Sequence, residues 1–223
     1  MPYYPILVAL EGKKVIVVGG GAVAQRKIET LLEYGAHVEV ISQELNPRLI
    51  SFLKEGKIKL VGREFQEDAL EGAFMVIAAT DDPSLNHKVS GMTRRKGILI
   101  NAVDQPGDCN FILPSILRRG DLLIAVSTSG KSPALAKKVR ERLERSFGRE
   151  YELFLTLMGH LREKILARGL SQDENRGFFY DLVNSPLIDT IAHNKWDEAI
   201  SIINNILKTD LSSHDIIQYL KEE

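Results

Sequence analysis

The sequence predicts an α/β protein built on a Rossmann-like, doubly wound parallel sheet, followed by a small αβ segment and a helical C-terminal region. In the first half of the chain, short apolar runs alternate with segments of helical periodicity. A glycine-rich turn, GGGAVA, joins the first apolar run to the first helical segment, and beyond residue 148 only helical periodicity remains. Alternating strands and helices are typical of parallel sheets. We therefore expect a Rossmann-like domain over residues 1–112, a connector or dimerisation segment over 113–148 and a helical domain over 149–223.

The first βαβ unit is the clearest part of this pattern. Residues 14–18 (KVIVV) form the unbroken apolar run expected for a strand that is buried on both faces. Apolar residues then recur at helical spacing over 22–34, and Gly35 ends that helix. A second strand follows at 37–41 (HVEVI), which completes a unit of the kind that binds dinucleotides.

The remaining elements of this domain follow in order. A helix is expected over 47–55 and a strand over 58–61. Two further apolar runs, 74–79 (FMVIAA) and 98–101 (ILIN), are expected to be buried strands, with a helix over 83–96 between them. These strands extend the parallel sheet.

The pattern changes in the second half of the chain. A strand is expected over 122–127, followed by a turn-rich loop (TSGKSP) and an amphipathic helix over 134–147. This strand lies outside the predicted sheet and needs a hydrogen-bonding partner, which a second copy of the chain would supply. The helical periodicity that follows breaks at Gly169, residues 184–186 and residues 209–210.

Composition and charge argue against several classes of function. Hydrophobic residues make up 44% of the chain and charged residues 26%, as in ordinary globular proteins. With 29 basic and 30 acidic residues, the net charge of −1 argues against nucleic acid or a membrane surface as the main partner. No apolar run approaches the ~20 residues that cross a bilayer, and the N-terminus lacks the basic segment of a signal peptide. We therefore expect a cytoplasmic protein.

The chain contains one cysteine and five histidines. A single Cys109 excludes an internal disulfide and a multi-cysteine metal site, and we expect a packed thiol. The histidines are scattered without the spacing of metal ligands. The sequence therefore predicts no protein metal site.

The glycine turn has the spacing of a dinucleotide-binding loop. Gly19, Gly21 and Ala24 match the pattern G-x-G-x-x-A between a strand and a helix. Gly19 permits the tight turn, Gly21 lets the backbone approach a pyrophosphate, and Ala24 lets the helix pack close to the sheet. The free N–H groups at the start of the helix, including those of Ala22 and Val23, are expected to bind the phosphates of the cofactor. The alternative is a turn that serves chain geometry alone.

Ribose recognition is less regular. The second strand ends at Ser42 rather than at the acidic residue typical of NAD-binding proteins, and Gln43 follows it. Ser42 can hydrogen-bond a ribose hydroxyl, and no arginine stands beside it in the sequence to bind a 2′-phosphate, which favours NAD over NADP. Thr80 follows a buried strand and is expected to reach the cofactor, while Asp81 or Asp82 is expected to cap the next helix.

Several motifs together resemble one family. Residues 101–104 (NAVD), 111–115 (FILPS) and 125–144 (AVSTSGKSPALAKKVRERLE), joined to VVGGGAVAQRK and IAATDD, are similar to the precorrin-2 dehydrogenase/sirohydrochlorin ferrochelatase family. That family includes the N-terminal half of bifunctional siroheme synthases and stand-alone proteins of about this length. The resemblance covers essentially the whole chain. It implies NAD-dependent oxidation of precorrin-2 to sirohydrochlorin, in many relatives with Fe²⁺ as a second substrate, and it implies a homodimer.

The resemblance places the catalytic aspartate at Asp104, which follows a strand at the carboxyl end of the sheet. Oxidation of precorrin-2 removes a hydride and a proton, and a carboxylate close to the transferred hydride can take that proton. Insertion of a metal likewise releases two pyrrole protons. The alternatives for Asp104 are a turn residue before Gln105 and a carboxylate that only orients the macrocycle.

A second group of residues is expected to bind the tetrapyrrole. Backbone N–H groups of the TSGKSP loop, at the start of a helix, can receive its acetate and propionate carboxylates. The alternative is a capping loop for a surface helix. The resemblance aligns Thr128 with a serine that can be phosphorylated in bifunctional relatives. The expected substrate-binding residues are Asn110, Ser127, Thr128, Ser129, Gly130 and Lys131.

Two other functions stay open. Stand-alone family members differ in whether they chelate iron as a second or even main activity, and no residue of the sequence decides it. A non-enzymatic NAD-sensing module, as Rossmann domains of regulatory proteins can be, predicts NAD binding without turnover and no task for Asp104. The motifs NAVD and STSGKSP, which a ligand sensor does not need, count against this alternative.

Overall fold

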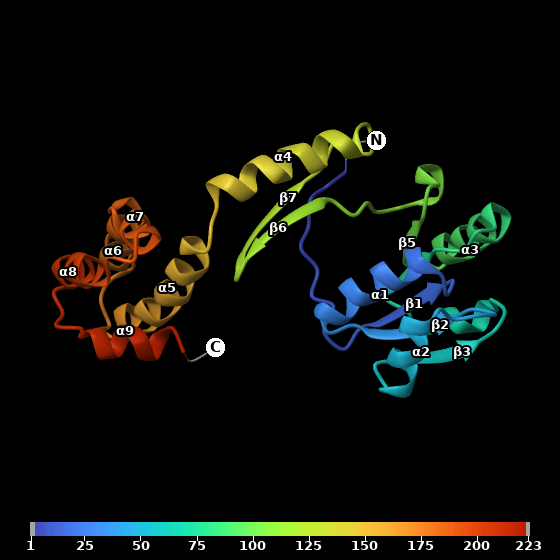
Figure 1. Cartoon of the computed structure of the whole chain (residues 1–223), viewed down its shortest axis with the longest axis horizontal. Helices are drawn as coiled ribbons and strands as arrows, with labels where there is room; N and C mark the ends of the chain where they lie inside the picture. The colour runs from blue at the N-terminus through green and yellow to red at the C-terminus, as the bar shows by residue number, and fades with distance from the viewer. Residues whose placement is uncertain (1–2, 222–223) are drawn as a thin grey trace. The chain divides into compact units, whose positions relative to one another are not determined.

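The computed structural model describes residues 3–221, and the chain forms two compact units, residues 1–113 and 114–223 (Figure 1). Each unit buries its own set of apolar side chains. The first unit holds the sheet that the sequence predicts. The second holds a hairpin and a group of helices.

The first unit is built on a five-stranded parallel sheet with the strand order β3-β2-β1-β4-β5. The chain runs outward from β1 through β2 to β3 and then returns to the other side of β1. Ligands bind such sheets at the carboxyl ends of the strands, where this order reverses. The strands are β1 (Lys14–Val18), β2 (His37–Ile41), β3 (Ile58–Gly62), β4 (Met75–Ala78) and β5 (Leu99–Ala102).

Helices cover both faces of the sheet, which confirms the predicted doubly wound fold. Alternate residues of β1 point to opposite faces, so Val15 and Val17 pack against one set of helices while Ile16 and Val18 pack against the other. All four side chains are buried, which explains the unbroken apolar run. One face is covered by α1 (Ala22–Glu33) and α2 (Pro47–Lys54), and the other by α3 (Pro83–Arg95) and the short turn η1 (Glu67–Leu70).

The second unit begins with an antiparallel hairpin, β6 (Ser115–Arg119) and β7 (Leu122–Val126), and Figure 1 shows α4 (Pro133–Ser146) running along it. The expectation that the strand over 122–127 needs a second copy of the chain as its partner is wrong. Its partner is β6 of the same chain, in a register that pairs Ser115 with Val126. Apolar periodicity does not predict β6, because two of its five residues are arginines.

Up to residue 221, five helices form the rest of the second unit, one more than the predicted breaks separate, because residues 193–195 also interrupt the helical pattern. They are α5 (Glu150–Leu166), α6 (Gln172–Asn184), α7 (Leu187–Ala192), α8 (Trp196–Leu207) and α9 (Ser213–Tyr219). Leu157, Leu161 and Ile165 of α5, four residues apart, are fully buried in their common core. Two serines, Ser171 and Ser212, form capping boxes at the starts of α6 and α9. Within residues 3–221, no helix has the length and apolar character needed to cross a membrane.

The core of the second unit can be tested by truncating Leu161 on α5. Leu161→Ala should lower the free energy of unfolding of this unit by about 2–5 kcal/mol, because it leaves a cavity among fully buried side chains. The measurement is urea unfolding followed by the fluorescence of Trp196, which is the one tryptophan of the chain and packs against this core.

The matched control is Leu166→Ala on the same helix, where the leucine is 48% exposed. It should change stability by less than about 0.5 kcal/mol. Equal losses for the two variants would show that the core is not organised as described.

Candidate cofactor and active site

Gly19 lies in a tight turn that brings its backbone against the loop after β4. Its φ of +124° belongs to the region that favours glycine. A Cβ at this position would lie 2.2 Å from the carbonyl oxygen of Ala79, and the Gly19 N–H donates to the carbonyl of Ile41 at 2.9 Å. The turn expected from the sequence is therefore present, and no larger side chain fits it.

Gly20 is equally constrained, although the sequence motif leaves this position unspecified. A Cβ on Gly20 would lie 2.0 Å from the carbonyl oxygen of Glu44 and 2.6 Å from the hydroxyl oxygen of Ser42. The Gly20 carbonyl accepts a hydrogen bond from the Asn46 N–H at 3.0 Å. The glycine turn is thus packed between the loops that follow β2 and β4.

Gly21 differs from its two neighbours because its side-chain direction is open. A Cβ there would meet no heavy atom within 4 Å. Gly21 caps α1, and among the described residues the N–H groups of Ala22, Val23 and Ala24 have no hydrogen-bond acceptor. The first turn of α1 also lacks an acidic side chain. This open helix N-terminus can receive the negative charge of a pyrophosphate.

Asn86 fixes the loop that follows β4. This side chain is only 3% exposed, and its Oδ1 accepts hydrogen bonds from the N–H of Thr80 at 3.2 Å and from the Thr80 hydroxyl at 2.8 Å. Its Nδ2 donates to the Thr80 carbonyl at 3.0 Å. The sequence predicts that Thr80 reaches the cofactor. In the structure, the Thr80 hydroxyl is hydrogen-bonded to Asn86. The sequence motif does not indicate Asn86, because only the fold buries its amide against this loop.

Asp82 caps α3, as predicted, and accepts hydrogen bonds from the N–H groups of Ser84 at 2.8 Å and Leu85 at 3.2 Å. The cap begins α3 directly after the Thr80 loop. It therefore helps to fix the end of β4 beside the glycine turn.

Ser42 lies at the end of β2, where a ribose would bind. Its hydroxyl donates to the carbonyl of Glu44 at 2.6 Å, and Gln43 beside it is exposed. The Ser42 N–H donates to the carbonyl of Gly62 at 3.1 Å, so the end of β3, with Arg63 next in the chain, lies alongside. Arg63 is far from Ser42 in the sequence, so the residues next to Ser42 in the chain do not identify it. The two positions come together because β2 and β3 pair in the sheet.

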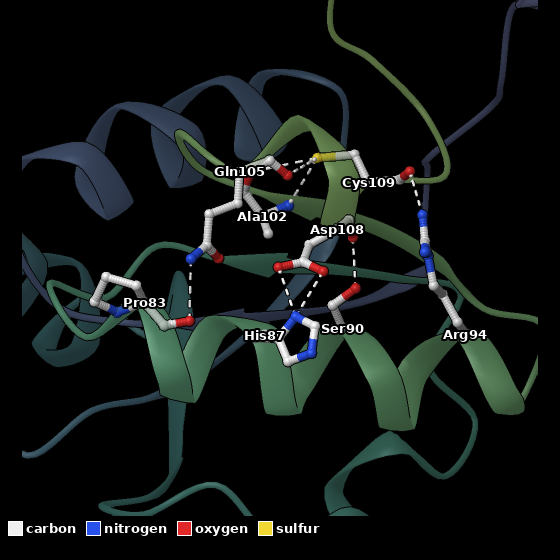
Figure 2. Close-up of polar contacts among 8 residues, drawn as sticks. All are labelled: Pro83, His87, Ser90, Arg94, Ala102, Gln105, Asp108 and Cys109. Atoms are coloured by element: carbon white, nitrogen blue, oxygen red, sulfur yellow. Dashed lines mark hydrogen bonds and ion pairs between the residues drawn. The ribbon is translucent and has the colours of Figure 1, made fainter. Parts of the chain in front are cut away.

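Asp104 follows β5 at the same edge of the sheet and is exposed. Its φ of +59° is left-handed, a conformation that aspartate and asparagine adopt more readily than most residues. The turn is closed by the thiol of Cys109, which donates to the Ala102 carbonyl at 3.3 Å and accepts from the Ala102 N–H at 3.2 Å (Figure 2). Burial raises the pKa of this thiol, so the packed, protonated cysteine expected from the sequence is present.

Three side chains of α3 hold the far end of the Asp104 loop, as Figure 2 shows. His87 Nδ1 lies 2.9 Å from the Asp108 carboxylate, and the Ser90 hydroxyl donates to the Asp108 carbonyl at 2.5 Å. Arg94 donates to the carbonyl of Cys109 at 2.7 Å. These α3 residues are spaced three and four apart and so share one face of the helix. The sequence does not indicate these three contacts, because the partners Asp108 and Cys109 lie far from α3 in the chain.

Asn110, an expected substrate-binding residue, uses its side chain within the fold of the loop. Its Nδ2 donates to the carbonyl of Ile98 at 2.9 Å, and its Oδ1 accepts from the N–H of Ile100 at 2.8 Å. Both polar atoms of the side chain therefore bind the backbone of β5 and the residue before it. We assign Asn110 to the fold of the loop.

The other expected substrate-binding residues lie in the second unit, between β7 and α4. The hydroxyl of Ser127 accepts from the Ser129 N–H at 3.0 Å, and the Thr128 hydroxyl accepts from the Ser132 N–H at 3.0 Å. The Lys131 N–H donates to the Thr128 carbonyl at 3.0 Å. Three of the N–H groups expected to bind substrate carboxylates are therefore used inside the loop. Other donors there are the hydroxyl groups, the N–H groups of Thr128 and Gly130 and the Lys131 ammonium.

The cofactor residues expected from the sequence thus gather at one edge of the first unit, together with Asp104. They come from the ends of β1, β2, β4 and β5. In the part of the chain that the structure describes, no group of three or more His, Cys, Asp or Glu side chains is placed to hold a metal ion. The arrangement suits binding of a dinucleotide next to an exposed carboxylate.

Two protein families match the chain. Residues 6–115 match the family described as "Putative NAD(P)-binding", and residues 119–146 match "Sirohaem biosynthesis protein central". The first match covers the five-stranded sheet of the first unit, and the second covers β7 and α4.

Curated relatives carry the name siroheme synthase. The siroheme synthase of Photorhabdus laumondii is 38% identical over 199 residues, which is 89% of this chain and 42% of the relative. Siroheme synthase 1 of Serratia proteamaculans is 37% identical over 203 residues, again 89% of this chain and 42% of the relative. The chain therefore spans about two fifths of the length of the curated relatives it matches.

Among solved structures, the fold is similar to that of SirC, a precorrin-2 dehydrogenase. The TM-score is 0.77 with 23% sequence identity, and the match covers 93% of this chain and all of that chain. The likeness shows that the two proteins share a fold.

The same substitution should mainly lower stability at Gly20 and mainly lower NAD affinity at Gly21. Gly20→Ala should destabilise the first unit by about 1–3 kcal/mol, because the methyl group meets the Glu44 carbonyl. Gly21→Ala should cost less than about 1 kcal/mol, but the methyl group occupies space that a pyrophosphate needs, so NAD affinity should fall tenfold or more. Thermal unfolding and calorimetric NAD titration separate the two effects. Parental NAD affinity in Gly21→Ala would count against an anion cradle formed by Gly21 and the N–H groups of Ala22, Val23 and Ala24.

The buried thiol of Cys109 should react slowly. Its raised pKa leaves less thiolate at any given pH, and burial limits access, so alkylation by iodoacetamide at pH 8 should be roughly tenfold or more slower than that of free cysteine. Unfolding in urea should restore the rate of a free thiol. Because Cys109 is the one cysteine of the chain, the label reports on this loop alone. A native rate equal to that of free cysteine would contradict the closed turn.

Proposed function

The chain belongs to the family formed by the NAD(P)-binding and central parts of siroheme synthases, and on that premise we propose that it oxidises precorrin-2 to sirohydrochlorin with NAD. One observation carries this proposal. The open N-terminus of α1 and the exposed Asp104 turn lie at the same edge of one sheet. An anion cradle and a potential proton acceptor are thus held by a single rigid element.

The residues present fit a dinucleotide. Gly21 leaves the space open, and the unpaired N–H groups of Ala22, Val23 and Ala24 bind the pyrophosphate. Ser42 and Gln43 bind the adenosine ribose, and the Thr80 loop borders the cofactor through its backbone, since the Thr80 hydroxyl is used within the loop. When bound, the nicotinamide supplies the acceptor for the hydride.

Asp104 is the proton acceptor in this proposal. Its exposed carboxylate takes the proton from the ring position next to the one that loses the hydride, so the two losses together create the new double bond. The closed turn between Ala102 and Cys109 keeps this carboxylate in place. Separately, for the loop between β7 and α4 of the second unit, we propose that the hydroxyls of Ser127, Thr128 and Ser129, with Gly130 and Lys131, bind carboxylates of a tetrapyrrole.

We extend the proposal to Fe²⁺ as a second substrate of the same site. Insertion of iron requires two pyrrole protons to leave, and we propose Asp104 as their acceptor. Because the described residues offer no ligand cluster for a resident metal, the tetrapyrrole nitrogens hold the ion. Incubating the protein with metal-free sirohydrochlorin and Fe²⁺ or Co²⁺ tests this extension, and a rate equal to the spontaneous one removes it.

We also propose that the protein acts as a homodimer in the cytoplasm. A two-stranded hairpin is marginal by itself, and β6 and β7 present apolar side chains such as Ile116, which is 37% exposed. Leu135 of α4, at 51% exposure, adds to the apolar surface of this unit. A second copy of the chain would cover it.

The test of the main proposal is an anaerobic assay with precorrin-2, run in parallel with NAD and NADP. Asp104→Asn keeps the left-handed turn accessible and removes the carboxylate, so kcat should fall by roughly 10²–10⁴-fold while the Kd for NAD stays at the parental value. The exposed Asp173 of α6 supplies the control, Asp173→Asn, which should keep parental kcat.

Three results would count against this assignment. An Asp104→Asn variant with parental kcat would remove Asp104 as the proton acceptor. A parental protein that binds NAD but does not turn over precorrin-2 would favour the NAD-sensing module instead. Faster turnover with NADP than with NAD would overturn the preference for NAD and would make Arg63 the candidate for binding the 2′-phosphate.

A further inference from the structure

Lys27 is a half-buried cation near the Asp104 turn, and the proposed mechanism does not use it. It lies on α1 one turn after Val23, on the same side of the helix. Val23 packs against the same core cluster as Val103, the residue that precedes Asp104. The charge of Asp104 also acts on Lys27. Asp104 is thus near enough for its charge to act on the Lys27 ammonium, and α1 and the loop after β5 pack on the same core.

The surroundings of Lys27 leave its ammonium group short of negative charge. Burial lowers the pKa of Lys27, the neighbouring Arg26 lowers it further, and Asp104 acts in the opposite direction. No hydrogen bond or ion pair of the Lys27 ammonium occurs among residues 3–221. Lys14 shows the contrast, with the Glu39 carboxylate at 3.1 Å and a carbonyl at 3.0 Å. A partly desolvated ammonium without a bonded partner favours an incoming anion.

The position of Lys27 along α1 separates it from the pyrophosphate cradle. With a rise of about 1.5 Å per residue, Lys27 lies roughly 4.5–7.5 Å further along the helix than the N–H groups of Ala22–Ala24. An anion at Lys27 that is separate from the pyrophosphate leaves NAD affinity independent of Lys27, which the variants below measure. The tetrapyrrole of the proposed reaction carries acetate and propionate carboxylates around its edge, and such a group can reach Lys27 while the ring lies at Asp104.

We propose that Lys27 binds a side-chain carboxylate of the tetrapyrrole and thereby selects which edge of the macrocycle meets Asp104. This inference rests on the proposed function, because it takes the substrate from it. A charge-assisted hydrogen bond of this kind contributes to substrate binding more than to the chemical step. A purely structural charge pair between α1 and the loop would instead contribute to stability and leave tetrapyrrole affinity unchanged.

Three variants test the assignment: Lys27→Met, Lys27→Arg and, as control, Lys54→Met at the exposed end of α2. Lys27→Met should raise the KM for precorrin-2 and the Kd for sirohydrochlorin by about tenfold or more. Its kcat should change much less, and its NAD affinity and melting temperature should stay parental. Lys27→Arg should retain most of the tetrapyrrole affinity, because it keeps the charge, and Lys54→Met should match the parental protein throughout.

The outcomes distinguish this inference from the function on which it rests. If the parental protein oxidises precorrin-2 but Lys27→Met keeps the parental Kd for sirohydrochlorin, Lys27 does not bind substrate, and the proposed function stands. A Lys27→Met variant that loses only thermal stability likewise overturns substrate binding by Lys27 and identifies a structural charge pair. If the parental protein neither oxidises precorrin-2 nor binds sirohydrochlorin, the proposed function fails and the role of Lys27 fails with it.

Discussion

The packing of one backbone turn between two others is the constraint on which the first unit depends. Gly19 is pressed against the carbonyl of Ala79, and Gly20 against that of Glu44, with no space for a methyl group at either position. Hydrogen bonds from Gly19 to Ile41 and from Asn46 to Gly20 join the glycine turn to the end of β2 and to the loop that follows it. Because these contacts close two sides of the turn, the remaining side, at Gly21, is left open at the start of α1. The cradle is the consequence of this packing.

The two halves of the site are held by different means. Backbone packing fixes the cradle, and its geometry depends on the absence of side chains at two positions. The Asp104 loop is fixed by side chains instead, through the thiol of Cys109 and the contacts of α3 with Asp108 and with the Cys109 carbonyl. The first half therefore depends on glycine at two positions, whereas the second depends on particular partners that lie far apart in the sequence.

A structural feature is predictable from the sequence when it depends on residues that are near one another in the chain. The strands are predictable because burial on both faces leaves unbroken apolar runs such as KVIVV, and Gly19 because a tight turn needs a residue without a side chain. Features that depend on partners far away in the chain are not predictable in this way. Ser42 lies beside the end of β3, next to Arg63, only after β2 and β3 have paired. The strand β6 is not recognised from its own sequence, because it contains two arginines and forms by pairing with β7.

The left-handed backbone at position 104 has an evolutionary consequence. Asparagine is the side chain that replaces aspartate there with least strain, and a single nucleotide change converts one codon into the other. The product of that change keeps the sheet, the glycine turn and the loop, and lacks only the carboxylate. Under the proposed role of Asp104, this single change would give a folded protein that binds the nucleotide but has lost its proton acceptor.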